Sequence, residues 1–199
     1  MLHGLLVDLV PYTQVFRERE HQWRNHEAMF WASGGDRPIV TKAQLKAQHD
    51  ASVQPGSGPI RWGIQTKDGA RIGFVVIDDI DFYNRHALLG ALIGESDYWG
   101  SGYGTDALLL IVAYVFDWLD LRKVWLSTVS ENARVVRQME KVGFVLEARQ
   151  RQGELMDGRR SDTLVYALQR EEWPGRDTII QPYRPAGAVK SDQLSGISG

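Results

Sequence analysis

Hydrophobic and polar positions in the first 50 residues predict one strand followed by helices. The apolar run Leu5–Val10 is typical of a short strand. Apolar residues recur at helical spacing over Thr13–Phe30, which predicts one or two amphipathic helices. Thr41 and Gln44 have the spacing of a capping box, so a helix is expected from Lys42 to about His49.

The middle of the chain has the pattern of an antiparallel sheet. Three strand-like runs follow one another at Ile60–Thr66, Arg71–Asp78 and Ala87–Gly94. The sequence Lys-Asp-Gly at 67–69 separates the first two runs and is a hairpin turn signal. We therefore expect a meander of three strands before position 95.

The second half alternates helices and strands. Thr105–Leu119 is apolar nearly all round, which predicts a mostly buried helix. A strand is expected at Lys123–Val129, followed by a helix at Asn132–Val142 with apolar residues at helical spacing. Two further strands are expected at Phe144–Gln150 and Thr163–Leu168. The chain as a whole is thus expected to be a mixed-sheet α/β (α+β) protein.

Length and composition limit the organisation and the partners. The 199 residues suit a single domain at 1–177, and the Gly-, Ser- and Pro-rich residues 178–199 are expected to be a flexible tail. A net charge of −2 gives no electrostatic case for nucleic acid. The absence of cysteine excludes disulfides, thiolate metal sites and cysteine nucleophiles, and it fits a cytoplasmic protein; we expect no metal site. The longest apolar stretch, 107–119, is too short for a membrane span.

The strongest local feature is a glycine-rich turn between a strand and the buried helix. Glycines at 100, 102 and 104 allow a tight turn and close approach of a ligand to the backbone. Free amides at the start of the following helix form an anion site suited to a pyrophosphate. Glycines that serve only the turn geometry are the alternative. A nucleoside-triphosphate loop is disfavoured because Gly104 is followed by Thr105-Asp106 rather than Lys-Ser/Thr.

Two ordered motifs resemble the GNAT superfamily of N-acetyltransferases. Residues 98–107, Y-W-G-S-G-Y-G-T-D-A, resemble the Y-W-G-K-G-Y-A-T-E-A of its RimJ/RimL-like branch, with Trp99 at the Gln/Arg position of the superfamily's phosphate loop. Residues 132–144, N-A-R-V-V-R-Q-M-E-K-V-G-F, are similar to the family's N-x-R-S-x-R-x-Y-E-K-x-G-F. The resemblance extends over roughly Leu5 to Trp173.

The resemblance implies the GNAT acyl-CoA N-acyltransferase fold, with splayed central strands and flanking helices. Acetyl-CoA would lie in the gap between the fourth and fifth strands as co-substrate. Strand backbone at 92–94 would bond the pantetheine arm, amides at 100–105 would hold the pyrophosphate, and Asn132 would contact the cofactor from the opposite side. The residues expected to hold acetyl-CoA are Leu92, Ile93, Gly94, Trp99, Gly100, Ser101, Gly102, Tyr103, Gly104, Thr105, Asn132 and Arg137.

Two departures from the family pattern concern proton transfer. Leu88 stands where the branch often has Glu, and Met139 stands where the family has the Tyr that protonates the thiolate. Neither side chain exchanges protons, which leaves water or a nearby group to do so. His86 shares strand parity with Leu88, and Glu95 follows the strand, so both are candidate catalytic residues; a solvated surface position is the alternative for each.

The expected acceptor is a primary amine, on a protein N-terminus or a small molecule. The acidic cluster at Asp78, Asp79 and Asp81 would attract a cationic amine, or it is simply a surface turn. Trp23, Phe30 and Trp31 are expected either to border the acceptor site or to pack in the core; they all lie in the early helices. A catalytically silent acyl-CoA-binding module is the alternative function. Oligomeric state is open, with a homodimer as one possibility.

Overall fold

A single mixed sheet organises the part of the chain that the structure, a computed structural model, describes: residues 1–32, 39–52 and 58–183. Its strand order is β1-β2-β3-β4-β5-β6-β8-β7, and every neighbouring pair is antiparallel except β5 and β6. The strands are β1 (Leu2–His3), β2 (Val7–Pro11), β3 (Ile60–Thr66), β4 (Arg71–Asp81), β5 (His86–Ile93), β6 (Lys123–Val129), β7 (Val145–Met156) and β8 (Arg159–Gln169). The expected mixed-sheet class is confirmed.

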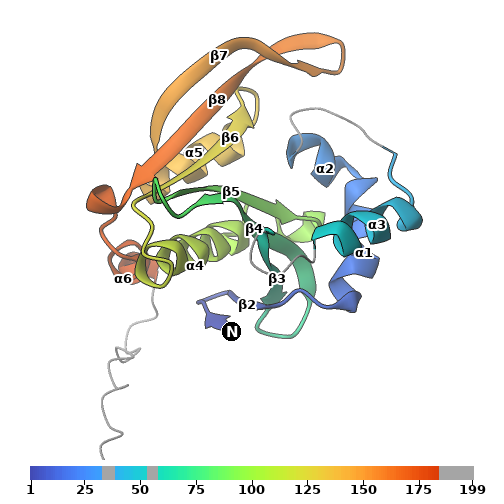
Figure 1. Ribbon diagram of the computed structural model, residues 1–199, viewed down its shortest axis with the longest axis horizontal. Helices are drawn as coiled ribbons and strands as arrows, with labels where there is room; N and C mark the ends of the chain where they lie inside the picture. The colour runs from blue at the N-terminus through green and yellow to red at the C-terminus, as the bar shows by residue number, and fades with distance from the viewer. Residues whose placement is uncertain (33–38, 53–57, 184–199) are drawn as a thin grey trace, which may run out of the picture.

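Helices cover both faces of the sheet (Figure 1). On one face, α4 crosses the middle of the sheet, with α5 and α6 beside it; on the other, α1 and α2 pack on β4 and β5, and α3 packs on α1. The α-helices are α1 (Gln14–Arg24), α2 (Glu27–Ala32), α3 (Lys42–Ser52), α4 (Tyr103–Asp117), α5 (Ala133–Val142) and α6 (Arg176–Ile180). Three short 3-10 turns lie at Ser96–Tyr98, Arg170–Glu172 and Gln181–Tyr183.

Strands β5 and β6 pair only at their beginnings. Three residues, His86 to Leu88, lie opposite Lys123 to Trp125 in parallel register. Beyond this point β5 stays paired with β4 to Ile93, and β6 stays paired with β8 to Val129, but β5 and β6 no longer pair with each other. A V-shaped gap results, as the family resemblance implies, with Leu88 and Trp125 at its vertex.

The core follows the two-residue period of the strands. In β4, Val75 and Ile77 are fully buried on the face that packs against α4, whereas Phe74 lies on the opposite face with Trp23 of α1. Helix α4 is buried on nearly all sides, as its apolar sequence predicts. Consequently α4 is the central structural element on its face of the sheet.

Asp106, in the first turn of α4, joins three distant segments. Its carboxylate accepts hydrogen bonds from the backbone amides of Leu6 (2.7 Å) and Val7 (3.1 Å). It also pairs with Arg176 of α6 at 3.1 Å. The side chain is only 5% exposed, so these partners replace the water that the charge has lost. The N-terminal strand and α6 are thereby held against the start of α4.

Several boundaries differ from the sequence expectation. Helix α4 begins at Tyr103, two residues early, because Gly102 is its N-cap in a left-handed conformation (φ 92°). Strand β4 continues to Asp81 through a bulge in its pairing with β5, and β8 begins at Arg159. The short strand β1 was not expected. The Thr41 and Gln44 capping box is confirmed by hydrogen bonds in both directions.

The C-terminal segment is ordered further than the sequence suggests. A flexible tail was expected from 178, but α6 continues to Ile180, whose side chain is 3% exposed and packs in the main core. Burial of an apolar side chain stabilises this helix even though the neighbouring sequence is polar. The expected tail residues 184–199 lie outside the described residues, and the domain boundary stays a prediction.

A buried carboxylate at Glu20 fixes α1 and α3 on the sheet. It is fully buried and accepts hydrogen bonds from Tyr12, from Arg24 at 2.7 Å and from His49 of α3 at 2.8 Å. Arg61 of β3 lies 3.5 Å away. Burial alone would raise the pKa of Glu20, but the hydrogen bonds and positive charges outweigh burial and lower it. Desolvation and the same carboxylate raise the pKa of Tyr12.

We expect Glu20→Gln to lower the free energy of unfolding by about 3 kcal/mol at pH 7, because two arginines lose their buried partner. The folded-state pKa lies below the usual 4.5, so this stabilisation is present above pH 4.5 and is lost as the pH falls through the folded value. Urea unfolding of both proteins between pH 7 and pH 2.5 measures this, and their difference should shrink on acidification. Glu18→Gln, at an exposed position two residues away, serves as control and should change little. A constant difference across this range contradicts the assignment.

Candidate functional site

A cavity of about 580 Å³ lies where β5 and β6 separate. Strand β5 forms one wall, β6 and α5 form the other, and the glycine-rich turn with the first residues of α4 lies at the open end. Helix α2 contributes Ala28, Trp31 and Ala32 along the opening above β5. The motifs singled out in the sequence therefore meet around one space.

The glycine-rich turn presents unpaired backbone amides to this cavity. Gly100 and Gly102 have φ of 76° and 92°, conformations that favour glycine. The first intrahelical bond of α4 runs from the Asp106 amide to the Gly102 carbonyl at 2.9 Å. The amides of residues 103–105 precede this bond and so have no acceptor within the helix. Together with the helix dipole they form an anion site.

Trp99 connects the two walls of the cavity at its open end. Its indole Nε1 donates to the carbonyl of Ile93 in β5 at 2.8 Å. The Arg134 guanidinium of α5 lies over the same indole ring, 4.4 Å from its centre. Partial burial lowers the pKa of Arg134, while Glu27 acts in the opposite direction, and an arginine keeps its charge under such a shift. A cation–π contact thus spans the gap beside the anion site.

Helix α5 supplies the cationic wall. Arg134, Arg137 and Lys141 line the cavity from this helix, and Gln138 approaches Gly104. Asn132 is the N-cap of α5 and accepts the Val135 amide at 3.4 Å while lining the cavity. Positive charge on α5 and free amides on α4 thus face a common space, an arrangement suited to an anion with several phosphates.

Most residues expected to hold the cofactor surround the cavity, and three do not. Leu92, Ile93, Trp99, Gly100, Gly102, Gly104, Thr105, Asn132 and Arg137 line it. Ser101 is exposed, and the Tyr103 ring packs edge-on against Tyr98 with centroids 5.0 Å apart. Gly94 is buried, and its amide donates back to Ile72 of β4 at 2.8 Å. Their cofactor roles stay predictions.

The structure does not bring the two candidate catalytic residues into the cavity. Glu95 accepts hydrogen bonds from Arg19 at 3.0 Å and from Trp23 at 3.1 Å, on the α1 side of the sheet. His86 begins β5 beside Asp81, with Nε2 3.8 Å from the carboxylate. Neither is among the residues that line the cavity. Their catalytic roles also stay predictions.

Leu88 and Met139, the two positions that depart from the family pattern, both line the cavity. Asp78 of β4 lines it as well; the sequence placed Asp78 in an acidic cluster that either attracts a cationic amine or is simply a surface turn. The strand parity of β4 with β5 is the signal that identifies it, since Asp78 lies directly opposite Leu88. Of the three early aromatic residues, only Trp31 lines the cavity, whereas Trp23 and Phe30 are core residues.

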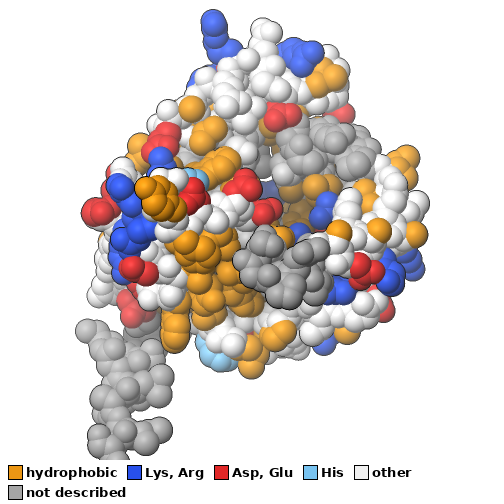
Figure 2. All heavy atoms as spheres, viewed as in Figure 1, with side chains coloured by type: hydrophobic (Ala, Val, Ile, Leu, Met, Phe, Trp, Pro, Cys, Tyr) orange, Lys and Arg blue, Asp and Glu red, His pale blue; other side chains and the backbone are white. Residues whose placement is uncertain are grey.

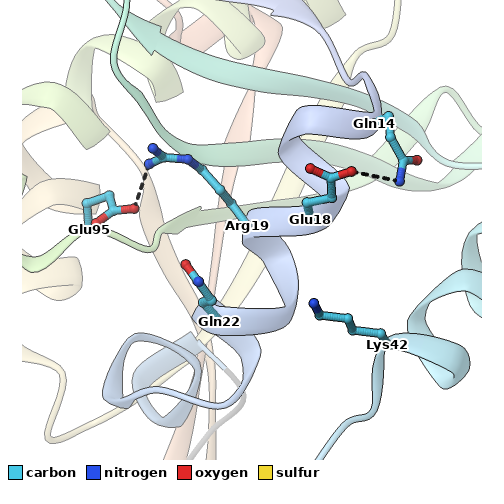
Figure 3. Close-up of a pocket in the computed structure, with 6 residues that line it drawn as sticks. All are labelled: Gln14, Glu18, Arg19, Gln22, Lys42 and Glu95. Atoms are coloured by element: carbon cyan, nitrogen blue, oxygen red, sulfur yellow. Dashed lines mark hydrogen bonds and ion pairs between the residues drawn. The ribbon is translucent and has the colours of Figure 1, made fainter.

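A second, wider hollow of about 770 Å³ lies beside α1 and Glu95 (Figure 3). Its lining is entirely polar and comes from α1, the start of α3 and Glu95: Gln14, Glu18, Arg19, Gln22, Lys42 and Glu95. Within it Arg19 pairs with Glu95, and Gln14 bonds to Glu18. It offers no splayed strand edge and no glycine-rich turn, so we assign ligand binding to the β5–β6 cavity despite its smaller volume.

The described residues form neither a metal cluster nor a helix that could cross a membrane. Within residues 1–32, 39–52 and 58–183, no group of three or more His, Asp or Glu side chains is arranged to hold a metal ion. No helix in the same ranges is long and apolar enough to cross a membrane. On the face drawn in Figure 2, Lys and Arg side chains are interspersed with Asp and Glu.

Comparison with curated proteins finds related acetyltransferases. The chain is 30% identical over 108 residues to "Putative ribosomal N-acetyltransferase YdaF" of Bacillus subtilis, covering 54% of this chain and 58% of the relative. It is 34% identical over 138 residues to the spermidine N(1)-acetyltransferase of Escherichia coli strain K12, covering 68% of each protein. The chain therefore spans little more than half the length of the Bacillus relative.

Solved structures share the fold. The spermidine N-acetyltransferase of Vibrio cholerae, in complex with CoA and spermine, superposes with a TM-score of 0.77 at 18% identity, covering 84% of this chain and 97% of that one. The profile of the acetyltransferase (GNAT) domain family matches residues 7–145. GNAT enzymes use acetyl-CoA as co-substrate. With more than half of its length matched, this chain belongs to the GNAT acetyltransferase family.

Proposed function

We propose that this chain is an acetyl-CoA-dependent N-acetyltransferase that acts on a primary amine by direct attack within a ternary complex. One observation carries the proposal: the cavity between β5 and β6 combines free amides at the start of α4 with the cationic face of α5. Family membership and the strand separation at Leu88 support it.

The residues present fit coenzyme A. Unpaired amides at 103–105 and the positive φ of Gly100 and Gly102 form a concave surface for a pyrophosphate. The unpaired edge of β5 beyond Leu88 offers backbone groups to an extended arm that carries amides. Arg134 and Arg137 would face the phosphates from α5. Acetyl-CoA, when bound, supplies an activated acetyl thioester.

The acceptor would approach from the α2 side of β5. Trp31 and Ala28 line this part of the cavity, and a neutral amine there would be held near the vertex of the gap. The E. coli relative is a spermidine acetyltransferase and the Bacillus relative carries a ribosomal name, so both a small amine and a protein N-terminus are acceptor classes to test.

Self-association belongs to the same proposal. Strand β7 is the last strand of the sheet, and most of its 12 residues are exposed, including Val145 and Leu155. An exposed edge strand can pair with a second copy. A spermidine N-acetyltransferase of Vibrio cholerae forms a dodecamer, and we propose a homodimer or larger assembly for this chain.

A catalytically silent acyl-CoA-binding module is the second candidate. Leu88 and Met139 favour it, because both line the cavity at positions where family members carry proton-transferring side chains. Such a module would bind the cofactor with the same residues and release no thiol.

Gly104 provides a test of the phosphate site. A Cβ there would meet Ile93 and Gln138 only at 3.5–3.6 Å, so a side chain can start at this position without a clash at its Cβ. We expect Gly104→Glu to weaken CoA binding about tenfold more than Gly104→Gln, because the two side chains match in size and differ only in a charge facing the phosphates. Calorimetric titration with CoA measures this, and the difference should shrink at high salt. Equal affinities of the two variants would place the phosphates elsewhere.

Acetyl transfer itself is tested with purified protein, acetyl-CoA and two amines: spermidine and a short peptide with a free N-terminus. We expect amine-dependent release of free thiol, with the acetylated amine detected by mass spectrometry. The N-acetylated form of the same peptide is the matched control and should release no thiol. Tight CoA binding without thiol release from either amine would support the silent module.

A further inference from the structure

Asp78 lies on the strand next to β5, directly across from Leu88. The two residues are partners in the antiparallel register of β4 and β5. Directly opposite residues have Cβ atoms about 5 Å apart and point to the same face. Both line the β5–β6 cavity. A carboxylate is thus present beside the position where the family often has one.

The face that carries Asp78 is the one open to the acceptor. Val76 and Gly90 form the next pair along the strands and also line the cavity. A Cβ on Gly90 would lie only 2.8 Å from the Val76 side chain, so glycine keeps this part of the floor clear. Trp31 of α2 lines the same opening, and an indole face attracts a cationic amine.

Asp78 is also at the correct end of the cavity. Leu88 is the last residue of β5 that pairs with β6. From Leu88 to Ile93 the strand rises about 17 Å, so a ligand anchored at the start of α4 has to extend along β5 to place its reactive end near the vertex. Asp78 would then face that reactive end, whereas Arg134, Arg137 and Lys141 line the cavity from α5.

The neighbouring carboxylates are placed differently. Asp78 is the only Asp or Glu among the described residues that line the cavity. Asp79 is exposed, and Asp81 accepts both the amide and the side chain of Asn84 at 2.7 Å. Asp78 accepts the Asp79 amide through Oδ1 at 3.0 Å, and this bond orients the carboxylate. The face in Figure 2 shows acidic side chains near its middle, next to hydrophobic ones.

We propose that Asp78 is the catalytic carboxylate of this enzyme: it contacts the acceptor amine and accepts its proton, in place of a glutamate at position 88. The inference rests on the proposed acetyltransferase function. It also narrows the acceptor to an amine that is cationic in solution, since a carboxylate beside an indole attracts such a group.

The chemistry balances without another reactant. The ammonium ion loses one proton to water and becomes the nucleophile. Its nitrogen forms a bond to the acetyl carbonyl carbon, and Asp78 accepts the second proton, which becomes acidic as this C–N bond forms. The C–S bond then breaks, the thiolate leaves with the electron pair, and the proton held by Asp78 neutralises it.

Asp78→Asn tests the proposal, because Asn keeps the shape and the acceptor for the Asp79 amide but cannot take a proton. We expect kcat/KM for the accepted amine, spermidine or the peptide, to fall about 100-fold while CoA affinity is unchanged. In calorimetry with CoA in place of acetyl-CoA, binding of that amine should weaken about tenfold. Asp79→Asn is the matched control, since it removes an adjacent exposed charge at a φ of 45° that Asn tolerates.

Restoring the carboxylate from the opposite strand gives a sharper readout. In the Asp78→Asn background, Leu88→Glu puts a carboxylate on the opposite strand of the same pair. We expect kcat/KM of this double variant to be at least about tenfold higher than that of Asp78→Asn alone. A residue with a merely structural role would not be rescued in this way. Leu88→Gln in the same background controls for size and should recover nothing.

The outcomes separate the two levels of the proposal. Absence of turnover by the wild type with both amines overturns the proposed function, and the role of Asp78 with it. If the Asp78→Asn variant turns over as fast as the wild type, the role of Asp78 is overturned while the proposed function stands. The same holds if Asp79→Asn lowers turnover as much as Asp78→Asn does. Loss of activity without rescue by Leu88→Glu assigns Asp78 a structural role.

Discussion

The three-residue pairing of β5 with β6 is the constraint on which the site depends. Each strand stays bonded on its outer side, to β4 and to β8, and each loses its inner partner beyond Leu88 and Trp125. Backbone amides and carbonyls along these inner edges require other hydrogen-bond partners. A ligand that carries amides can supply them, so the gap selects for an extended amide-containing arm before any side chain is considered.

The surrounding helices keep this gap in a fixed shape. Helix α4 packs beneath both strands with its first turn at the open end, and Asp106 holds that turn to β2 and α6. On the other face, the Glu20 cluster fixes α1 and α3, and α2 continues from α1 to wall the opening. Neither buried carboxylate lines the cavity, yet both hold in place the elements that surround it.

Local sequence signals placed the glycine-rich turn before α4 and Asn132 at the start of α5, because each acts within a few residues. Gly102 starts α4, Asn132 caps α5, and the cationic face of α5 follows from helical spacing. The two candidate catalytic residues, in contrast, lie outside the cavity lining. Glu95 follows β5 in sequence but turns to Arg19 and Trp23, since the chain bends at Gly94 against the Trp23 ring. Only the register of β4 with β5 places Asp78 in the cavity, and no local pattern encodes that register.

Cross-strand geometry also explains how a motif can lose its acidic residue while the site keeps one. Positions 78 and 88 are directly opposite on one face of an antiparallel pair, so a carboxylate on either strand reaches nearly the same volume. Carboxylates at both positions would repel each other next to a partly buried site. A leucine at 88 removes that repulsion and adds an apolar surface at the vertex of the gap. On the proposed role of Asp78, the acid–base function belongs to the pair of opposed positions rather than to one residue of a linear motif.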